Sequence, residues 1–383
     1  MAYQRILHLP DLLAKKSFFL FGPRSTGKTY LINQQFKDHA LILNLLKSEV
    51  FLRLSDSPSD LRELISADQN KHKVIVIDEI QKIPQLLSEV HYLLDQFPYR
   101  FLLTGSSARK LKQAEVDLLA GRAWIANLFP LCSQEIPDFN LDRYLKYGGL
   151  PQVYPSANPL EELDAYIQNY LKEEILAEGL IRKLPPFSRF LKVAALSNGT
   201  LLNYTEIGND CAVAPTTVRE YYSVLEDTLI GFSLEPWVFS KKRKAIQTAK
   251  FYFFDTGVTH ILAGTKSLDR NSSIYGTSFE QLIAMELKAY LSYRRKKESL
   301  TFWRSKHGFE VDFLIGDHTA IEVKATKRIA AKHLKGLRAL AEEKIFKNFF
   351  LVSQDPIAFK KEGISVIPWQ TFLKKLWDDE IEF

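Results

Sequence analysis

An eight-residue loop near the start of the chain constrains the fold more than any other feature. The loop fits the pattern G-x-x-x-x-G-K-[ST], and its residues are Gly22, Pro23, Arg24, Ser25, Thr26, Gly27, Lys28 and Thr29. It lies between an apolar run at 16–21, expected to be a buried strand, and a helical stretch at 30–36. Its glycines let backbone N–H groups face phosphate oxygens, and the helix start adds a positive end. The sequence therefore predicts an α/β ATP-binding domain, in which Lys28 binds the β- and γ-phosphates and Thr29 binds Mg²⁺.

Two further apolar runs, at 73–77 and 100–103, end in polar residues. The first leads into Asp78 and Glu79, which we expect to bind Mg²⁺ and to polarise the attacking water as a general base, respectively. The second leads into Thr104-Gly105-Ser106-Ser107, where either Thr104 or Ser106 could sense the γ-phosphate. Strands that alternate with helical stretches predict a parallel sheet.

Arg122 follows a flexible glycine in the segment Leu119-Ala120-Gly121-Arg122. One interpretation is an arginine finger, which stabilises charge on ATP bound to a neighbouring subunit. The alternative is an ordinary surface arginine.

Composition sets wider limits on the class of protein. A chain of 383 residues is long enough for two or three domains. The net charge of +6 and pI near 9.0 are compatible with a nucleic-acid partner, although many soluble proteins are as basic. The two cysteines are far apart and predict neither a disulfide framework nor a zinc site. No signal-peptide pattern or membrane span is evident, so we expect a cytoplasmic protein without a membrane partner.

The middle of the chain has a helical pattern at 160–175 and then the layout of a helix-turn-helix followed by a hairpin. A short helix is expected from residue 205 and a second from Pro215, with Val218, Tyr222 and Leu225 facing the core. Side chains expected to face outward toward DNA are Thr216, Thr217, Arg219 and Tyr221. A wing would carry Lys241, Lys242, Arg243 and Lys244 to phosphates. The alternative is a winged helix used for packing or assembly, with a solvated basic loop.

A possible nuclease site lies near the C-terminus. Residues 308–315 and 320–324 are expected to form two strands of a hairpin, which carry Asp312, Glu322 and Lys324. Alternation puts Glu322 and Lys324 on one face. Asp312 and Glu322 could then share Mg²⁺ or Mn²⁺, with Lys324 acting on water and Glu280 as a further ligand. The alternative is an ion-pair cluster between strands.

The motifs together resemble a known family over almost the whole chain. In order they are the phosphate loop, VIVIDEIQKIP, RFLLTGSSA, LAGR, YGGLP and FYFFDTG. They resemble the bacterial and archaeal ATPases with an AAA+ domain of the AAA_14 type and a C-terminal DUF4143 domain. The resemblance implies an AAA+ core at 1–150, a helical, winged-helix-like part at 151–245 and a restriction-endonuclease-like α/β domain at 246–383. It also implies a homo-oligomer, such as a hexamer.

Three functions are open on this basis. The first is an ATPase that couples Mg²⁺-dependent hydrolysis to DNA binding or remodelling. The second is an ATP-regulated, metal-dependent DNA nuclease. The third is an assembly or docking protein under nucleotide control.

Overall fold

The computed structural model describes residues 3–68, 72–106, 119–171 and 184–381. Contacts divide the chain into two compact units, one built mainly from residues up to Phe129 and one mainly from Pro130 onward. Each is described by itself below. Within the described residues, no helix combines the length and apolar character needed to cross a membrane.

The first unit contains a five-stranded sheet in the order β2-β3-β4-β1-β5, with every neighbouring pair parallel. This confirms the predicted α/β class and the three predicted strands. The strands are β1 (Ser17–Phe21), β2 (Leu41–Asn44), β3 (Val74–Asp78), β4 (Arg100–Gly105) and β5 (Ala123–Asn127). Because all run parallel, their carboxyl ends meet at one edge of the sheet, where ligands bind in open α/β sheets.

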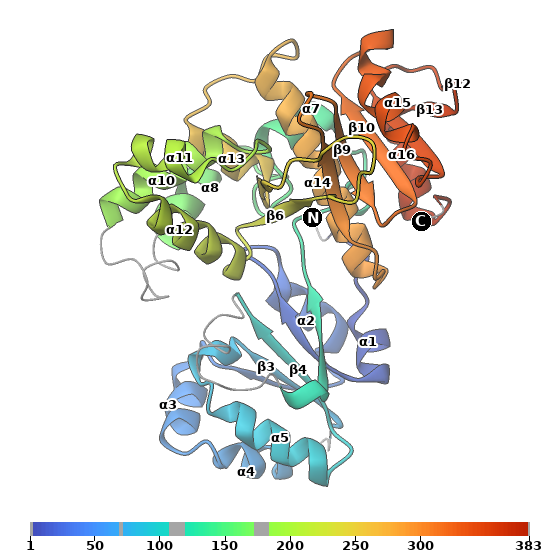
Figure 1. Cartoon of the computed structure of the whole chain (residues 1–383). Helices are drawn as coiled ribbons and strands as arrows, with labels where there is room; N and C mark the ends of the chain where they lie inside the picture. The colour runs from blue at the N-terminus through green and yellow to red at the C-terminus, as the bar shows by residue number, and fades with distance from the viewer. Residues whose placement is uncertain (1–2, 69–71, 107–118, 172–183, 382–383) are drawn as a thin grey trace. The chain divides into compact units, whose positions relative to one another are not determined.

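Helices cover both faces of this sheet (Figure 1). They are α1 (Leu9–Lys15), α2 (Lys28–Phe36), α3 (Ser48–Asp56), α4 (Asp60–Ser66) and α5 (Leu86–Gln96). Alternate strand residues such as Phe19, Ile75 and Leu103 share one core cluster with residues of α3, α4 and α5. α1 packs against β1, β4 and α2. The buried faces of β1 and β3 thus fix the two loops that follow these strands.

The second unit begins with helices and continues into a second sheet. Its α-helices are α7 (Leu141–Tyr147), α8 (Pro159–Ala165), α10 (Leu184–Leu196), α11 (Tyr204–Cys211), α12 (Pro215–Asp227), α13 (Thr256–Ala263), α14 (Ser273–Tyr293), α15 (Lys335–Ala341) and α16 (Trp369–Trp377). The two predicted short helices of the middle segment are confirmed as α11 and α12. The helix expected from residue 160 begins at Pro159, and residue 175, the expected end of that pattern, lies outside the described residues.

The eight-stranded sheet has the order β12-β13-β11-β10-β9-β8-β6-β7. Its strands are β6 (Gly231–Pro236), β7 (Lys250–Phe253), β8 (Leu300–Arg304), β9 (Glu310–Ile315), β10 (Thr319–Lys324), β11 (Asn348–Ser353), β12 (Phe359–Lys361) and β13 (Ile364–Pro368). β6 pairs with both β7 and β8. The predicted boundary at 245/246 therefore falls between two strands of one sheet, and the contacts do not separate 151–245 from 246–383.

Candidate functional site

The loop from β1 to α2 has the backbone that the glycine pattern predicts. Ser25 and Gly27 both have positive φ, 62° and 92° respectively. A Cβ at Gly22 would lie 2.5 Å from the Leu128 carbonyl oxygen. Glycine is therefore required at position 22 because the Leu128 carbonyl approaches too closely for a side chain. At position 27 it is favoured because the backbone is left-handed.

A buried arginine braces this loop. The Arg5 guanidinium donates hydrogen bonds to the carbonyls of Thr26 (2.8 Å) and Phe129 (2.7 Å) and is only 9% exposed. The Thr26 hydroxyl closes the loop with a 2.8 Å bond to the Pro23 carbonyl. Sequence reasoning missed Arg5, because a single arginine far from the motif carries no signal.

The predicted cation and metal ligands converge at the carboxyl ends of β1 and β3. The Lys28 ammonium donates to the carbonyls of Gly22 (2.6 Å) and Pro23 (3.1 Å). The Thr29 hydroxyl donates to Asp78 Oδ2 at 2.9 Å. Asn44, at the end of β2, approaches the same oxygen at 3.3 Å and was not predicted. The hydroxyl and carboxylate expected to bind Mg²⁺ are thus adjacent.

Thr104 connects this centre to β4. Its hydroxyl donates to Asp78 Oδ1 and accepts the Glu79 backbone N–H at 3.1 Å. Ser106 Oγ instead lies 3.4 Å from Gln81 Nε2. Thr104 thus contacts the acid expected to bind metal, whereas Ser106 is close to the side chain beside the expected base. Ser107, the last residue of this motif, lies outside the described residues.

Glu79 is held in an unusual position by Gln81. Glu79 has a left-handed backbone (φ 66°), and its Oε2 accepts a 2.5 Å hydrogen bond from Gln81 Nε2. Burial raises the pKa of Glu79, and the nearby Lys28 partly opposes that shift. Gln81 Oε1 is buried and has no hydrogen-bond partner within the part of the chain that the structure describes. A Cβ on Gly105 would lie 2.7 Å from it. In the sequence Gln81 stands out only as part of a family motif, and the structure shows that its side chain contacts the expected base.

Arg122 is paired within its own unit. Its guanidinium binds the Asp95 carboxylate of α5 through two hydrogen bonds of 2.8 and 3.3 Å. The hydrogen bond from Arg122 lowers the pKa of Asp95. The arginine-finger role stays a prediction, and it would require this exposed pair to open.

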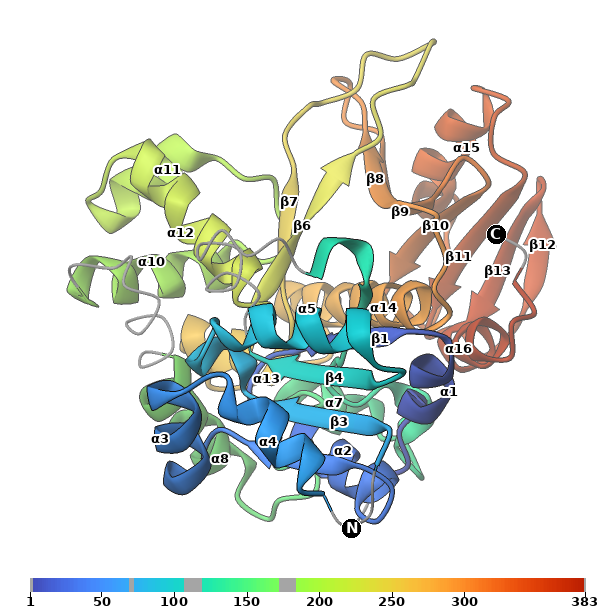
Figure 2. The same cartoon turned by 90° about the horizontal axis from the view of Figure 1, so that it is seen from below.

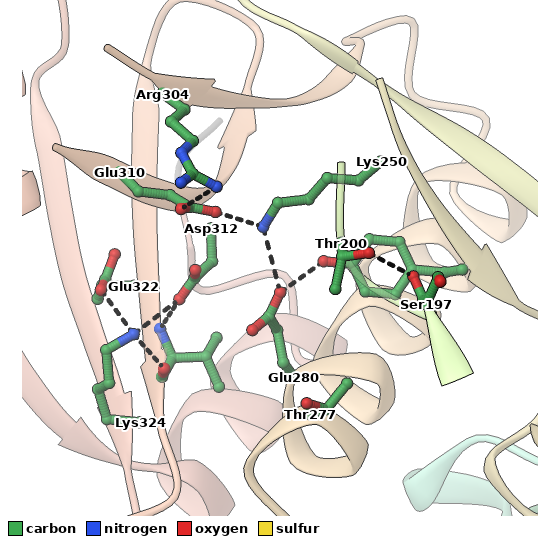
Figure 3. Close-up of polar contacts among 12 residues, drawn as sticks. Ser197, Thr200, Lys250, Thr277, Glu280, Arg304, Glu310, Asp312, Glu322 and Lys324 are labelled. Carbon is green, nitrogen blue, oxygen red and sulfur yellow. Dashed lines mark hydrogen bonds and ion pairs between the residues drawn. The ribbon is translucent and has the colours of Figure 1, made fainter. Parts of the chain in front are cut away.

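The predicted acidic pair of the C-terminal sheet lies on adjacent antiparallel strands. The β9–β10 register ends at the pair Phe313 and Ile321, next to Asp312 on one strand and Glu322 on the other, and Asp312 Oδ2 accepts the Val323 backbone N–H at 2.8 Å. Lys324 lies between their carboxylates, at 2.6 Å from Glu322 Oε1 and 3.3 Å from Asp312 Oδ2 (Figure 3). Asp312 is 4% and Glu322 6% exposed. Burial and the nearby Asp312 raise the pKa of Glu322, with Lys324 opposing.

Glu280, expected as a further ligand, has its own hydrogen-bond partners, although burial and, after it, the nearby Asp312 raise its pKa. Its Oε1 accepts a 2.5 Å hydrogen bond from Tyr252 and lies 3.5 Å from Lys250 Nζ. Lys250 also pairs with Glu310 at 2.6 Å, and Glu310 approaches Arg304 at 3.4 Å. Burial opposes the charged form of Lys250, but the surrounding carboxylates outweigh it and raise its pKa. Among the described residues, no three His, Cys, Asp or Glu side chains form a group that could hold a metal ion.

Some of the predicted DNA-contacting residues are exposed, and others contact other parts of the protein. On α12, Thr216 and Arg219 are exposed and Thr217 is half-buried. The prediction that Tyr221 faces outward is wrong: it is 9% exposed and packs edge-on against Phe187, with ring centroids 5.0 Å apart. Between β6 and β7, the basic residues Lys241, Lys242 and Lys244 are exposed. Arg243 is not, since it donates to the Ala339 carbonyl and pairs with Glu342.

Three family models match consecutive parts of the chain. A model described as "AAA domain" (AAA_14) matches residues 14–137, and "Domain of unknown function (DUF4143)" matches residues 275–372. Between them, "Domain of unknown function (DUF8612)" matches residues 138–269. With the parallel sheet and phosphate loop, the first match defines a P-loop ATPase fold of the AAA type. More particularly, the chain joins this AAA domain to a C-terminal DUF4143 domain, as its motifs predicted.

Curated relatives are similar in sequence to this chain over most of its length. The "uncharacterized protein Rv2008c" of Mycobacterium tuberculosis is 29% identical over 319 residues, which are 80% of this chain and 70% of that protein. An "uncharacterized protein" of Haemophilus influenzae is 24% identical over 297 residues, 70% of this chain and 72% of that protein. The similarity therefore extends well beyond the AAA domain.

Solved structures are more distant. The Walker-type ATPase PABY2304 of Pyrococcus abyssi has a TM-score of 0.43 and 15% identity, covering 66% of this chain and 93% of that chain. The ORC1 protein of Aeropyrum pernix in complex with DNA has a TM-score of 0.27 and 11% identity, covering 68% and 93%.

Proposed function

We propose that this protein binds ATP with Mg²⁺ and hydrolyses it at the edge of the five-stranded sheet. One observation carries the proposal: Lys28 and Thr29 at the start of α2 meet Asp78 and Glu79 at the end of β3, with Thr29 and Asp78 in a 2.9 Å hydrogen bond. A surface loop without this role would not need a lysine, a hydroxyl and two acids at one point.

The residues fit the chemistry of phosphoryl transfer to water. The loop N–H groups and Lys28 would hold the phosphates, with the Lys28 ammonium exchanging its carbonyl partners for phosphate oxygens. Thr29 and Asp78 offer the hard oxygen donors that Mg²⁺ prefers. The cation, when bound, would neutralise charge that develops on the phosphates. Glu79 would accept a proton from the attacking water, and Thr104 would keep Asp78 and the Glu79 backbone in place.

Lys28→Ala is expected to weaken binding of ATP with Mg²⁺ by at least about tenfold, because it removes a cation from the phosphate site without disturbing the sheet. Isothermal titration calorimetry of both proteins would measure this change. Lys15→Ala, at an exposed lysine outside the loop, serves as the matched control. Native-like binding by Lys28→Ala would place the nucleotide elsewhere.

DNA is the proposed target of the ATPase. Two features support a winged-helix-like contact with a DNA groove. Thr216 and Arg219 are exposed near the start of α12, and the helix pair α11–α12 is followed by β6 and β7.

We also propose that the protein assembles as a homo-oligomer in which Arg122 completes the nucleotide site of a neighbouring subunit. A homo-oligomer whose subunits share sites in this way would lose turnover, but not ATP binding, when Arg122 is replaced.

A second candidate function is metal-dependent cleavage of DNA. The observation that favours it is Glu322 Oε2, which is buried and has no hydrogen-bond partner among the described residues, although the other oxygen of this carboxylate pairs with Lys324. An unpaired buried carboxylate oxygen is costly, and a divalent cation would satisfy it. The two carboxylates suit Mg²⁺ or Mn²⁺, although the described residues supply no third acidic or histidine ligand.

Cleavage of single- and double-stranded DNA with Mg²⁺ or Mn²⁺, with and without ATP, tests this second function. We expect any cleavage to be lost in Glu322→Ala while ATP turnover continues. If the native chain cleaves no DNA but hydrolyses ATP, the C-terminal sheet serves binding or assembly instead.

A further inference from the structure

Two connections of the eight-stranded sheet are joined to each other beyond the ends of their strands. The first runs from β6 to β7 and the second from β8 to β9 (Figure 2). Ala245 and Ser305 form an antiparallel bridge. The Lys306 N–H donates to the Lys244 carbonyl at 3.0 Å, and the Ile246 N–H donates to the Arg304 carbonyl at 2.8 Å. We call these two connections the paired loops.

The paired loops are bound by an acidic residue, Glu343, which follows shortly after α15. The Glu343 carboxylate accepts hydrogen bonds from the Ser240 hydroxyl (2.6 Å) and from the backbone N–H groups of Lys241 (2.9 Å) and Lys242 (3.1 Å). Burial alone would raise the pKa of Glu343, but these hydrogen bonds lower it. In these contacts the Glu343 carboxylate binds the Ser240 hydroxyl and the loop backbone, and not the lysine side chains.

Arg243 adds a second anchor. Its guanidinium donates to the Ala339 carbonyl and to Glu342, both at 2.9 Å, and lies 5.2 Å from the centre of the Phe309 ring. Trp237, at the start of the connection, is buried and donates from its indole nitrogen to Asp317 at 2.8 Å. Basic loops that are merely solvated would not require these anchoring contacts, since ordering each backbone residue costs about 1–2 kcal/mol of conformational entropy.

The side chains that remain outward include several basic ones and an aromatic one. Lys241, Lys242, Lys244 and Lys306 are exposed, as is His307. Phe239 is 70% exposed. The bracing therefore fixes a backbone that carries four exposed lysines and one exposed aromatic ring, drawn from two segments of the chain.

We propose that the paired loops bind the backbone of a nucleic acid, with Lys241, Lys242, Lys244 and Lys306 on phosphates and Phe239 against an unstacked base. This inference deepens the proposed action on DNA and rests on it. Exposed lysines on a braced backbone, together with an exposed ring, match the combination of charge and stacking used on single strands. β9 begins directly after the second loop and carries Asp312, whose pair with Glu322 suits phosphodiester chemistry. That position favours a nucleic acid over an anionic lipid surface.

The test measures binding of the full chain to labelled duplex DNA, single-stranded DNA and RNA of one length, by fluorescence anisotropy over a salt series. The variants are Lys241→Ala/Lys242→Ala/Lys244→Ala, Lys306→Ala/His307→Ala and Phe239→Ala. The control is Lys360→Ala/Lys361→Ala, on the exposed edge strand β12. ATP turnover is measured for all, because none of these residues lies in the nucleotide site.

We expect the triple variant to bind at least about tenfold more weakly than the native chain. Its slope of log K against log[salt] should become shallower by about 0.9 for each duplex phosphate that the variant no longer neutralises. The Lys306/His307 variant should show a smaller change of the same kind. Phe239→Ala should weaken single-strand binding by about five- to a hundredfold, with little effect on duplex. The three nucleic acids together show which backbone is preferred.

Native-like affinity and salt slope in the triple variant would overturn the inference, while the proposed ATPase and a DNA contact through α12 would stand. A native chain that binds anionic vesicles but no nucleic acid would also overturn it, and with it the proposed DNA target. Equal effects in the Lys360/Lys361 control would reduce the change to overall charge and reject a defined surface.

Discussion

Replacing Glu79 by glutamine is expected to lower the rate of ATP hydrolysis by about 10²–10⁴-fold, while the affinity for ATP with Mg²⁺ stays within a few-fold of native. The amide keeps the shape of the side chain but cannot accept a proton from water. Binding should survive because Lys28, Thr29 and Asp78 are unchanged. Single-turnover hydrolysis and calorimetric binding, measured on the same preparations, separate the two quantities.

The pH profile gives an independent readout of the same residue. Burial raises the pKa of Glu79, so native turnover should rise with pH as this carboxyl loses its proton. That rising limb should be missing from the residual activity of Glu79→Gln.

Gln81→Ala provides the comparison within the same site. It removes the 2.5 Å hydrogen bond to Glu79 but leaves the carboxylate, so its effect should be smaller and should fall on the rate of hydrolysis rather than on binding. Equal turnover in the native and Glu79→Gln proteins would show that another group activates the water.

Replacing Lys324 by methionine is expected to destabilise the second unit by about 2–4 kcal/mol, somewhat less than the removal of a fully buried ion-pair partner. Lys324 is one-third exposed, whereas Asp312 and Glu322 are buried beside it. The ammonium lies 2.6 Å from Glu322 and 3.3 Å from Asp312, so its removal leaves two close carboxylates without this cation. Urea unfolding followed by circular dichroism measures the change.

Two companion measurements show what the acidic pair is for. Lys360→Met, on strand β12, should change stability little, because every residue of that short edge strand is exposed to solvent. Mg²⁺ or Mn²⁺ should restore part of the stability of Lys324→Met if the carboxylates can bind a divalent cation. A Lys324→Met protein as stable as the native one would contradict the electrostatic role given to this lysine.

The parts of the site that the sequence predicts are those encoded in short segments. The phosphate loop, Asp78-Glu79 and Thr104 each follow an apolar run, and parallel strands necessarily bring such ends to one edge. Likewise, Asp312 and Glu322 come together because a hairpin fixes the register of its own two strands.

The parts that the sequence does not predict depend on contacts between distant segments. Arg5 reaches Thr26 and Phe129, and Lys250 reaches Glu280 and Glu310; no local pattern contains such pairs. Helical spacing alone predicts that Tyr221 faces outward, but aromatic residues of α10 supply a second packing surface. The predicted boundary at 245/246 follows a basic run in the sequence. In the structure, β6 precedes that boundary and pairs with β8, which follows it.

The most direct test of the account is phosphate release from ATP with Mg²⁺ by the purified native chain and by Lys28→Ala, with and without DNA. We predict measurable release by the native protein, its disappearance on chelation of Mg²⁺, and a decrease of about 10²-fold or more in Lys28→Ala. Release by Lys28→Ala at the native rate, or no release and no ATP binding by the native chain under any of these conditions, would contradict it.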